Sequence, residues 1–328
     1  GEMNNLNNPE LKAIFNLDSR EELKNKLTQY GNEEAIRSLT TKNLALAAEQ
    51  ATKNWQKIAL KFILWIIFLS GLFFYFKKHE NTAKLRKGLL FTSVLLFGVI
   101  LGSDPGPMGT VKDAIHLFAN TGAIFLPRII AFLVFLLGVL LANKYICSWG
   151  CQAGTLQDLI YRLNQNSDYK TILGKQIKLP FALTNTIRML FFIVFTGIAL
   201  LWGTDIIAPI DIFKIYNPVH LAVGGAIFIF ILLIASLFIY RPWCHLLCPF
   251  GLVGWLVEKL SINRINVDYE KCIACEKCAD ICPSTVMSAI LLKDKKTIPD
   301  CFACYNCVEI CPTNAIEFSS HPREAPPE

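Results

Sequence analysis

The sequence has few of the residues that bind haem or deliver copper. Its 328 residues include five histidines and four methionines. No C-x-x-C-H sequence for covalent haem attachment occurs, and no two histidines face each other across the apolar segments as b-type haem ligands would. We therefore expect no haem on this chain. The methionine-rich and histidine-rich tracts that often accompany copper handling are absent as well.

Charged residues are also scarce. They make up 18% of the chain, whereas hydrophobic residues make up 53% and the mean hydropathy is +0.41. This composition is too apolar for an ordinary soluble domain and indicates a membrane protein. The net charge of +6 fits lysines and arginines in cytoplasmic loops, and we expect no nucleic-acid partner. The sequence does not begin with a charged-then-apolar secretory signal.

Five apolar segments predict transmembrane helices in a lipid bilayer, at residues 55–76, 88–103, 128–143, 186–203 and 220–240. Lysines and arginines concentrate in 77–87 and 144–188, which the positive-inside rule places in the cytoplasm with everything after residue 241. We therefore expect a multi-pass protein of the cytoplasmic (inner) membrane whose residues 1–54 are external. That N-terminus requires a removed signal, a further upstream span, or a first segment that does not cross.

The chain divides into four predicted segments. Residues 1–54 are polar, with apolar residues at the spacing of short amphipathic helices. Residues 55–261 form the membrane domain, residues 262–320 a cysteine-rich domain, and residues 321–328 a tail. The expected fold class is a membrane all-α domain of about five transmembrane helices followed by a small α+β domain.

An internal repeat organises the predicted membrane domain. The stretches "NKYICSWGCQAGTLQDLIYRL" from Asn143 and "YRPWCHLLCPFGLVGWLVEKL" from Tyr240 both read C-x3-C-x2-G and continue into an amphipathic helix. Upstream, "GSD" at 102–104 recurs as "GTD" at 203–205. We interpret each unit as a two-helix hairpin ending in a cysteine pair, in a tandem repeat related by an axis along the membrane normal.

All twelve cysteines lie in short-spaced sets, which indicates metal ligation or a disulfide framework. A framework would suit a small secreted domain rather than a long apolar chain. The runs "CIACEKCADICP" and "CFACYNCVEICP" both read C-x2-C-x2-C-x3-C-P, the spacing of two-cluster ferredoxins, in which the fourth cysteine ligates the other cluster. One [4Fe-4S] cluster is therefore expected on Cys272, Cys275, Cys278 and Cys311. The second is expected on Cys301, Cys304, Cys307 and Cys282. A four-cysteine zinc site is the alternative, but it does not explain two identical runs.

The neighbours of these cysteines are expected to keep the clusters dry. The apolar residues that should form this shell are Ile273, Ala274, Ile281, Phe302, Ala303 and Ile310. A proline follows the last cysteine of each run, at Pro283 and Pro312, and Pro249 follows Cys248. We assign these three prolines to the surroundings of the clusters.

The stretches "CSWGCQAGTLQDLI" and "RPWCHLLCPFG", together with the terminal cysteine runs, resemble the NapH/NosR/CcoG group of membrane polyferredoxins. The resemblance covers roughly residues 88–320, and Gln152 stands where the group usually has proline. With no flavin-attachment sequence, the chain is more similar to NapH. The resemblance implies an electron-transfer subunit of a respiratory, quinol dehydrogenase-like complex with flavin, haem or iron–sulfur partners. Electrons would pass between the quinone pool or a cytoplasmic donor and a partner redox protein.

The remaining cysteines form the two C-x3-C pairs, Cys147, Cys151, Cys244 and Cys248. If the repeat brings the pairs together, they offer four thiolates for a third [4Fe-4S] cluster. Redox-active or structural thiols are one alternative, and copper or zinc on soft thiolates is another. The matching alternative functions are a copper-handling or cofactor-assembly protein and a structural subunit stabilised by its clusters.

Residues near the pairs and in the outer loops complete the predictions. Lys144 and Arg241 either offset cluster charge or extend their charged groups to the lipid headgroups. Pro249 and the glycines after each pair let the chain turn back from the helix end. In the outer loops, the groups that could take a quinol's proton are Asp104, His116 and Asp205. Alternatively, the acids cap helices.

Overall fold

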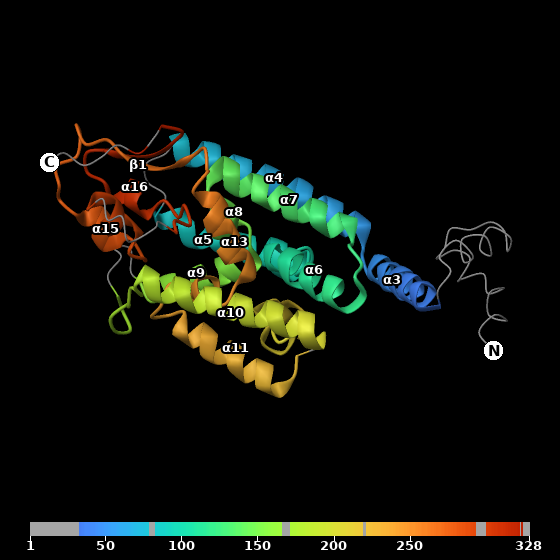
Figure 1. The fold of residues 1–328 in the computed structure, drawn as a ribbon. Coiled ribbons are helices and arrows are strands. Elements are labelled where there is room, and N and C mark those ends of the chain that lie inside the picture. Colours follow the sequence, from blue (N-terminus) through green and yellow to red (C-terminus); the bar gives the residue numbers. More distant parts are fainter. Residues whose placement is uncertain are drawn as a thin grey trace.

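The computed structural model describes residues 33–78, 83–165, 171–218, 221–292, 300–321 and 323. The part of the predicted N-terminal amphipathic segment before residue 33 lies outside this range. Its last part forms helix α3 (Glu33–Ala51), as the spacing of its apolar residues predicts. Helix α3 stands at the end of the molecule opposite the cysteine-rich domain (Figure 1).

The bundle contains two successive helical units. The first consists of α4 (Trp55–Lys78), α5 (Ala83–Ser93) with its π-helical continuation η2 (Val94–Ile100), α6 (Pro107–Thr121) and α7 (Leu126–Ala142). The second consists of α10 (Phe181–Trp202), the 3-10 turns η3 (Ala208–Ile210) and η4 (Ile212–Tyr216), and α11 (Val223–Ala235). Helices α4 and α7 run side by side in Figure 1, and α6 packs against both α7 and α10.

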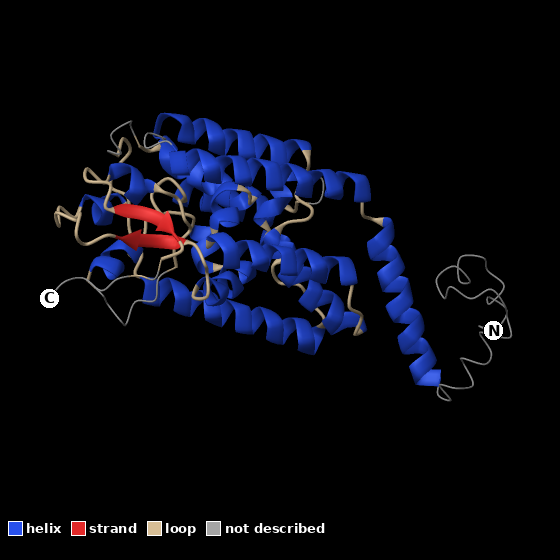
Figure 2. Ribbon diagram, turned by 90° about the horizontal axis from the view of Figure 1, so that it is seen from above, coloured by secondary structure: helices blue, strands red, loops and turns tan. Residues whose placement is uncertain are grey.

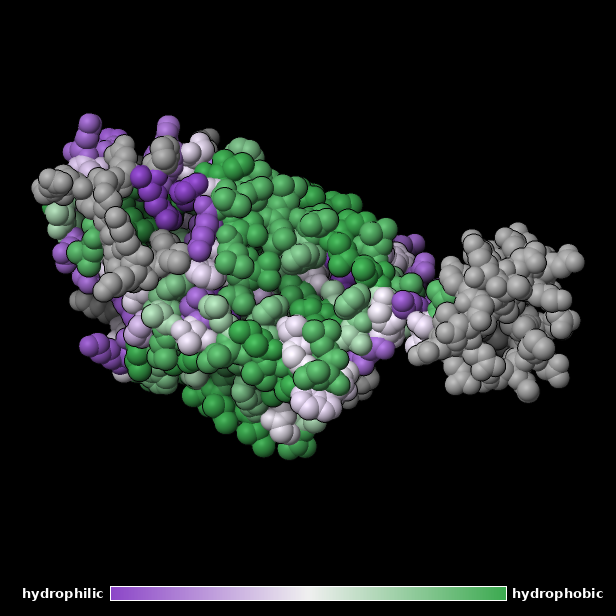
Figure 3. Space-filling view, in the orientation of Figure 1, coloured by the Kyte–Doolittle hydropathy of each residue, from purple (hydrophilic) through white to green (hydrophobic). Residues whose placement is uncertain are grey.

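Apolar side chains cover much of the outside of this bundle, as Figure 3 shows over its visible face. On α10, Leu201 and Trp202 are 75% and 72% exposed, and on α11 Val223 is 78% exposed. An exposed apolar surface of this extent is typical of a membrane or protein contact. Helix α4, over Trp55–Phe76, and helix α10 are long and apolar enough to cross a membrane.

The prediction of five spans is supported for two of the five segments. The third segment forms a 17-residue helix, α7, and the second is divided between α5 and η2. Within the predicted span 220–240, the helix α11 has 13 residues, Val223–Ala235, and is shorter than the apolar segment. This helix ends at Ala235, where the Ser236 hydroxyl donates to the Leu232 carbonyl and the chain enters tight turns. Crossing by the other three segments stays a prediction.

The two cysteine-pair stretches have the same local structure. Each contains a five-residue helix followed at once by a longer one: α8 (Tyr145–Trp149) and α9 (Gln152–Leu163), then α12 (Pro242–Leu246) and α13 (Pro249–Glu258). The second cysteine is the N-cap in both, with φ/ψ of −79°/120° at Cys151 and −72°/116° at Cys248. A side chain at Gly154 would overlap the Cys147 carbonyl, and a Cβ at Gly251 would come within 2.8 Å of the Cys244 carbonyl. The equivalent glycines are therefore needed for the same close approach.

The cysteine-rich domain lies at one end of the bundle. Its strands β1 (Arg264–Val267) and β2 (Ile316–Ser319) pair antiparallel, with Ile265 opposite Phe318. Figure 2 shows them at the end opposite α3. Between them lie the short helices α14 (Lys277–Ile281), α15 (Val286–Leu291) and α16 (Asn306–Ile310). The strands thus bracket both cysteine runs, as an α+β domain requires.

Candidate metal centres

The two cysteine runs fold into matching loops. Ala274 and Ala303, 29 positions apart, have φ of 53° and 50°, and the N-caps Glu276 and Tyr305 have φ of 58° and 65°. These left-handed residues turn each loop around its own three cysteines before a helix of five residues. The two loops therefore share the same local backbone conformation.

Each loop lines a cavity with the fourth cysteine of the other loop. Cys311 lines one cavity with the first three cysteines of the first run, Cys272, Cys275 and Cys278. Cys282 lines the other with the first three of the second run, Cys301, Cys304 and Cys307. This grouping has the crossed pattern of two-cluster ferredoxins. The side chains present fit a pair of cubanes.

The chemistry of the thiols also fits a metal. Burial raises the pKa of the Cys278 thiol to about 11, and it raises the pKa of Cys301 and Cys307 further. A buried free thiolate is therefore disfavoured. Coordination of iron would remove this cost because the sulfur charge is then shared with the metal.

The four cysteines of the C-x3-C pairs gather inside the bundle. Each is at most 9% exposed, and all four belong to one hydrophobic cluster. Cys244 is close enough to the other three for their thiolates to interact electrostatically. The Gly251 amide donates to the Cys248 sulfur at 3.4 Å, a type of contact that tunes iron–sulfur clusters. This arrangement agrees with the prediction that the repeat brings the two C-x3-C pairs together.

Within the described residues, no three Cys, His, Asp or Glu side chains are grouped closely enough to hold one metal ion. A cubane carries iron at four separate corners, so its thiolates stand further apart than the ligands of one zinc or copper ion.

The first pair is in direct contact with the second ferredoxin loop. The Ser148 hydroxyl, between Cys147 and Cys151, donates to the Phe302 carbonyl, and the Trp149 indole donates to the Ala303 carbonyl at 3.4 Å. Phe302 is 4% exposed and shares the hydrophobic cluster of the four bundle cysteines. One residue thus belongs both to a ferredoxin loop and to the packing around the pairs.

Arg241 is fully buried beside the cysteine pairs. It donates to the Cys147 carbonyl at 2.8 Å and forms an ion pair with Asp158 at 2.6 Å. It cannot reach lipid headgroups, so that alternative is wrong for this residue. Its left-handed backbone, with φ of 46°, starts the turn into Pro242.

Asp300, directly before Cys301, joins the bundle to the ferredoxin domain. Its carboxylate forms ion pairs with Lys144 and with Arg188, the latter at 3.0 Å, and all three side chains are at most 2% exposed. Burial alone would raise the pKa of Asp300, but the two cations hold it well below its usual value. Lys144 is therefore committed to a buried ion pair and does not extend to headgroups.

A further buried cation lies on α4. Lys61 is fully buried and donates to the carbonyls of Gly102 and Asp104 at 2.6 and 3.3 Å. Among the described residues its ammonium has no ion pair within 4 Å, and the groups that attract it electrostatically are the Asp104 carboxylate first and the Cys151 thiol second. A buried charge is costly unless such partners solvate it. Lys61 therefore connects α4 to the loop at residues 102–104 and lies near Cys151.

The three predicted quinone residues do not form one site. Asp104 forms an exposed ion pair with Lys53 at 2.7 Å. His116 contacts the Gly203 carbonyl at 3.1 Å, and Asp205 pairs with Lys112 at 3.1 Å. Asp205 also accepts from the backbone amides of residues 207 and 208, whereas the acid that caps a helical turn here is Asp211, which accepts from the Phe213 amide. The sequence could not show this because a lysine between several carboxylates depends on tertiary contacts.

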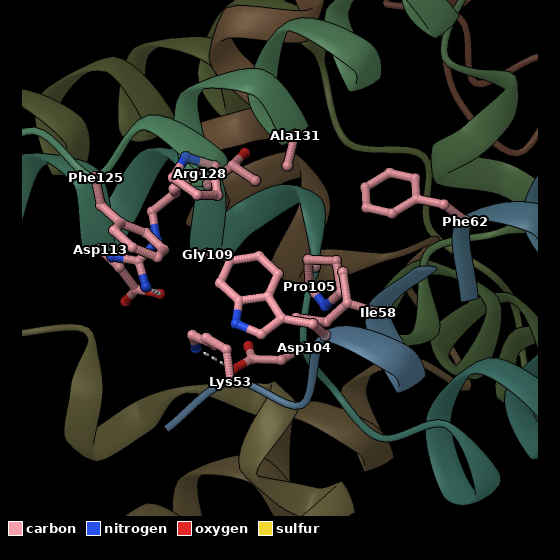
Figure 4. Close-up of a pocket in the computed structure, with 14 residues that line it drawn as sticks. Lys53, Ile58, Phe62, Asp104, Pro105, Gly109, Asp113, Phe125, Arg128 and Ala131 are labelled. Carbon is pink, nitrogen blue, oxygen red and sulfur yellow. Dashed lines mark hydrogen bonds and ion pairs between the residues drawn. The ribbon is translucent and has the colours of Figure 1, made fainter. Parts of the chain in front are cut away.

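An outer cavity lies between α4, α6 and α7 (Figure 4). Its apolar wall includes Trp55, Phe62 and Phe125, and its polar groups include Asp104 and Asp113. The loop that contributes Asp104 is bonded to the cysteine region, because the Gln152 amide donates to the Phe97 carbonyl at 3.0 Å and to the loop carbonyls of residues 102 and 103. Gln152, directly after the second cysteine of the first pair, is thus hydrogen-bonded to the loop that also contributes Asp104 to the cavity.

Comparison with known proteins identifies the cysteine-bearing segments. Residues 244–312 match a 4Fe-4S dicluster domain, and residues 124–180 match a 4Fe-4S binding domain. The first match includes both cysteine runs and the pair on α12 and α13. The chain is an iron–sulfur protein. The second match includes Cys147 and Cys151, outside the ferredoxin runs.

Two similar proteins extend this finding. YccM of Escherichia coli (strain K12), whose name describes it provisionally as an electron transport protein, is 35% identical over 157 residues, or 45% of this chain and 43% of YccM. This chain thus spans less than half of YccM. An uncharacterized protein of Methanocaldococcus jannaschii, MJ0749, is 24% identical over 211 residues, or 64% of this chain and 76% of that protein. No solved structure matches the chain. These relatives do not single out the NapH/NosR/CcoG group, which stays a prediction.

Sequence reasoning missed the buried charges that hold the site together. Arg188 interrupts a predicted span, and Lys61 interrupts another. Charged residues inside apolar segments usually mark functional positions, and this signal was present in the sequence. Asp300, the partner of Arg188, gave no comparable signal, because its burial arises only when the ferredoxin loop docks on the bundle.

Proposed function

We propose that the protein is a membrane electron-transfer subunit that carries three [4Fe-4S] clusters. It would exchange electrons between the quinone pool or a cytoplasmic donor and a partner redox protein. The cysteine sets of the two ferredoxin cavities would hold two clusters by crossed ligation, and the four C-x3-C cysteines would hold the third. The clusters would supply one-electron carriage, which none of the side chains offers.

The observation that carries this proposal is the contact between the two kinds of cysteine motif. Ser148 and Trp149, inside the first C-x3-C pair, hold the backbone of the second ferredoxin loop. Phe302 packs beside His245 at 5.0 Å between ring centroids, and the Lys144 ammonium lies 4.9 Å from its ring. A continuous packed and hydrogen-bonded path therefore supports electron exchange between the loop and the bundle.

Buried positive charge supports an anionic cofactor at the C-x3-C cysteines. Arg241 and Lys144 are paired with carboxylates, and Lys61 has two carbonyl partners, with the Asp104 carboxylate and the Cys151 thiol as electrostatic neighbours. A cubane on four thiolates carries net negative charge, which these buried cations would help to compensate.

The outer cavity supports a quinone at the other end of the path. Trp55 and Phe62 offer an apolar surface to a quinone ring, and Asp104 and Asp113 lie at its polar side. Oxidation of a quinol releases two electrons and two protons. The carboxylates would accept the protons, and the electrons would leave toward Cys151 on the far side of the loop. Of the three residues that the sequence predicted to take a quinol's proton, this proposal keeps Asp104. It replaces His116 and Asp205 with Asp113.

Metal content tests the proposal. The anaerobically purified protein should contain about twelve iron atoms per chain, four for each cubane, with an equal amount of sulfide. About eight iron atoms with bound copper would instead favour the copper-handling alternative. Replacement of Cys151 by serine should lower the iron content by about a third if the third cluster exists.

Protease access tests the predicted orientation. In sealed cells, an external protease should cleave within residues 1–54 and should spare residues 262–328, which we propose to be cytoplasmic. Cleavage of the ferredoxin domain from outside would reverse the topology.

A further inference from the structure

The two ferredoxin loops have the same backbone but opposite surroundings. Phe302 and Ala303 of the second loop are 4% and 0% exposed, whereas the equivalent Ile273 of the first loop is 63% exposed and Ala274 is also exposed. The expectation of a dry shell on both sides is therefore wrong for the first loop. Tyr305 and Asn306 continue the buried side, and their equivalents on α14 are exposed.

The bundle covers the second loop with hydrogen-bond donors. Arg86 donates to the Cys304 carbonyl at 2.5 Å and to the Glu309 carboxylate at 2.8 Å. Ser148 and Trp149 donate to the two preceding carbonyls of the loop. The Arg86 guanidinium thus contacts both the Cys304 carbonyl and the Glu309 carboxylate, beside the proposed cluster.

The first loop offers the same acceptors to solvent. The equivalents of Cys304 and Glu309, 29 positions earlier, are Cys275 and Asp280, and both are exposed. Lys178 donates to the main-chain carbonyl of Asp280 at 2.8 Å, so the contact leaves the carboxylate exposed. The first loop therefore leaves exposed, on the outside, the equivalents of two residues that Arg86 contacts in the second loop.

The charge of this face favours a cationic partner. Asp268 and Lys271 form an ion pair at 2.7 Å and cancel each other. Among the described residues, the exposed carboxylates nearby are Glu270, Glu276 and Asp280, against the exposed amines Lys178 and Lys277. The thiolates of a cluster on the exposed Cys275 would add further negative charge.

We propose that the exposed first-loop face, Ile273–Asp280, docks a small redox protein that presents lysine or arginine side chains beside its own cofactor. The inference rests on the proposed function, because it places the exchange with the partner at the cluster held by this loop. A partner cation would bind the Cys275 carbonyl and the Asp280 carboxylate as Arg86 binds their equivalents. Contacts of this exposed kind affect association rate and salt dependence most strongly.

The test uses the full chain in detergent and cytochrome c, whose haem edge is ringed by lysines. Binding is measured by calorimetry with redox-inactive zinc-substituted cytochrome c at low ionic strength. Reduction of native cytochrome c by the pre-reduced protein is followed by stopped flow. Asp280→Lys should weaken binding and slow the second-order reaction by about tenfold, and the difference should shrink at high salt.

Matched variants separate docking from general charge. Glu317→Lys makes the same charge reversal on β2, in the same domain, and should change both quantities by less than about twofold. Ile273→Ser adds no charge and should weaken binding without changing its salt dependence. Reduction of ferricyanide, an anion that needs no such face, should not slow in Asp280→Lys.

Several results would overturn the proposal. Equal effects of Asp280→Lys and Glu317→Lys would mean that only the overall charge matters. A wild-type dimer that Asp280→Lys dissociates would mean that a second copy occupies the face. Wild-type protein that lacks iron would contradict the proposed function instead, and in that case zinc cytochrome c would still report whether the face binds.

Discussion

The most informative single substitution in the bundle is Asp300→Asn. Asp300 is the shared partner of Lys144 and Arg188, and the three side chains are at most 2% exposed. The change keeps the size of the side chain but leaves two buried cations facing a neutral amide. Removal of one partner from a buried ion pair costs about 3–5 kcal/mol. We expect the free energy of unfolding to fall by that amount.

Guanidinium titration in detergent, followed by tryptophan fluorescence, measures this loss. Asp268→Asn is the matched control, because it removes the exposed ion pair with Lys271 in the same domain, and it should not shift the midpoint measurably.

The two cations hold the pKa of Asp300 below its usual value. Its contribution is therefore complete above the unfolded pKa of about 3.9 and is lost only as the pH falls further. The difference between wild type and Asp300→Asn should accordingly be present at about pH 5 and should shrink as the pH falls below about 3.9. Equal stability of Asp300→Asn and the control would refute the docking of the ferredoxin domain through this group.

Three further substitutions test other parts of the account. Cys282→Ser should abolish the EPR signal of the second ferredoxin cluster, and Cys278→Ser that of the first; loss of the first signal alone in Cys282→Ser would contradict the crossed ligation. Gly154→Ala should destabilise the protein by about 1–3 kcal/mol through overlap with a backbone carbonyl, whereas Gly138→Ala, which meets no atom within 4 Å, should not. Lys61→Met should lower the midpoint potential of the third cluster in an EPR redox titration, because it removes a nearby positive charge; an unchanged potential with higher stability would argue against an anionic cofactor there.

Local patterns predicted the cysteine loops well. The spacing of each ferredoxin run restricts the backbone so strongly that both loops adopt the same left-handed residues at Ala274 and Ala303. The glycines after each C-x3-C pair likewise marked close approaches that only glycine permits. In these stretches, the sequence determines the structure through short-range sterics.

Long-range packing set the features that the sequence did not show. Helix α11 is shorter than its apolar run because hydrogen bonds of the turn at Ser236 end it. The opposite exposure of Phe302 and Ile273 arises because one ferredoxin loop docks on the bundle and the other does not. No local property of the two runs, which are nearly identical in pattern, distinguishes the buried loop from the exposed one.

The most direct test of the central claim is an EPR comparison of Cys147→Ser and Cys248→Ser in the reduced, anaerobically purified protein. These cysteines come from different halves of the bundle, so a shared cluster requires that both changes abolish the same signal. The account predicts this result, with both ferredoxin signals intact in each variant. Survival of every iron–sulfur signal in either variant, or a disulfide between Cys147 and Cys151 in the wild type, would contradict it.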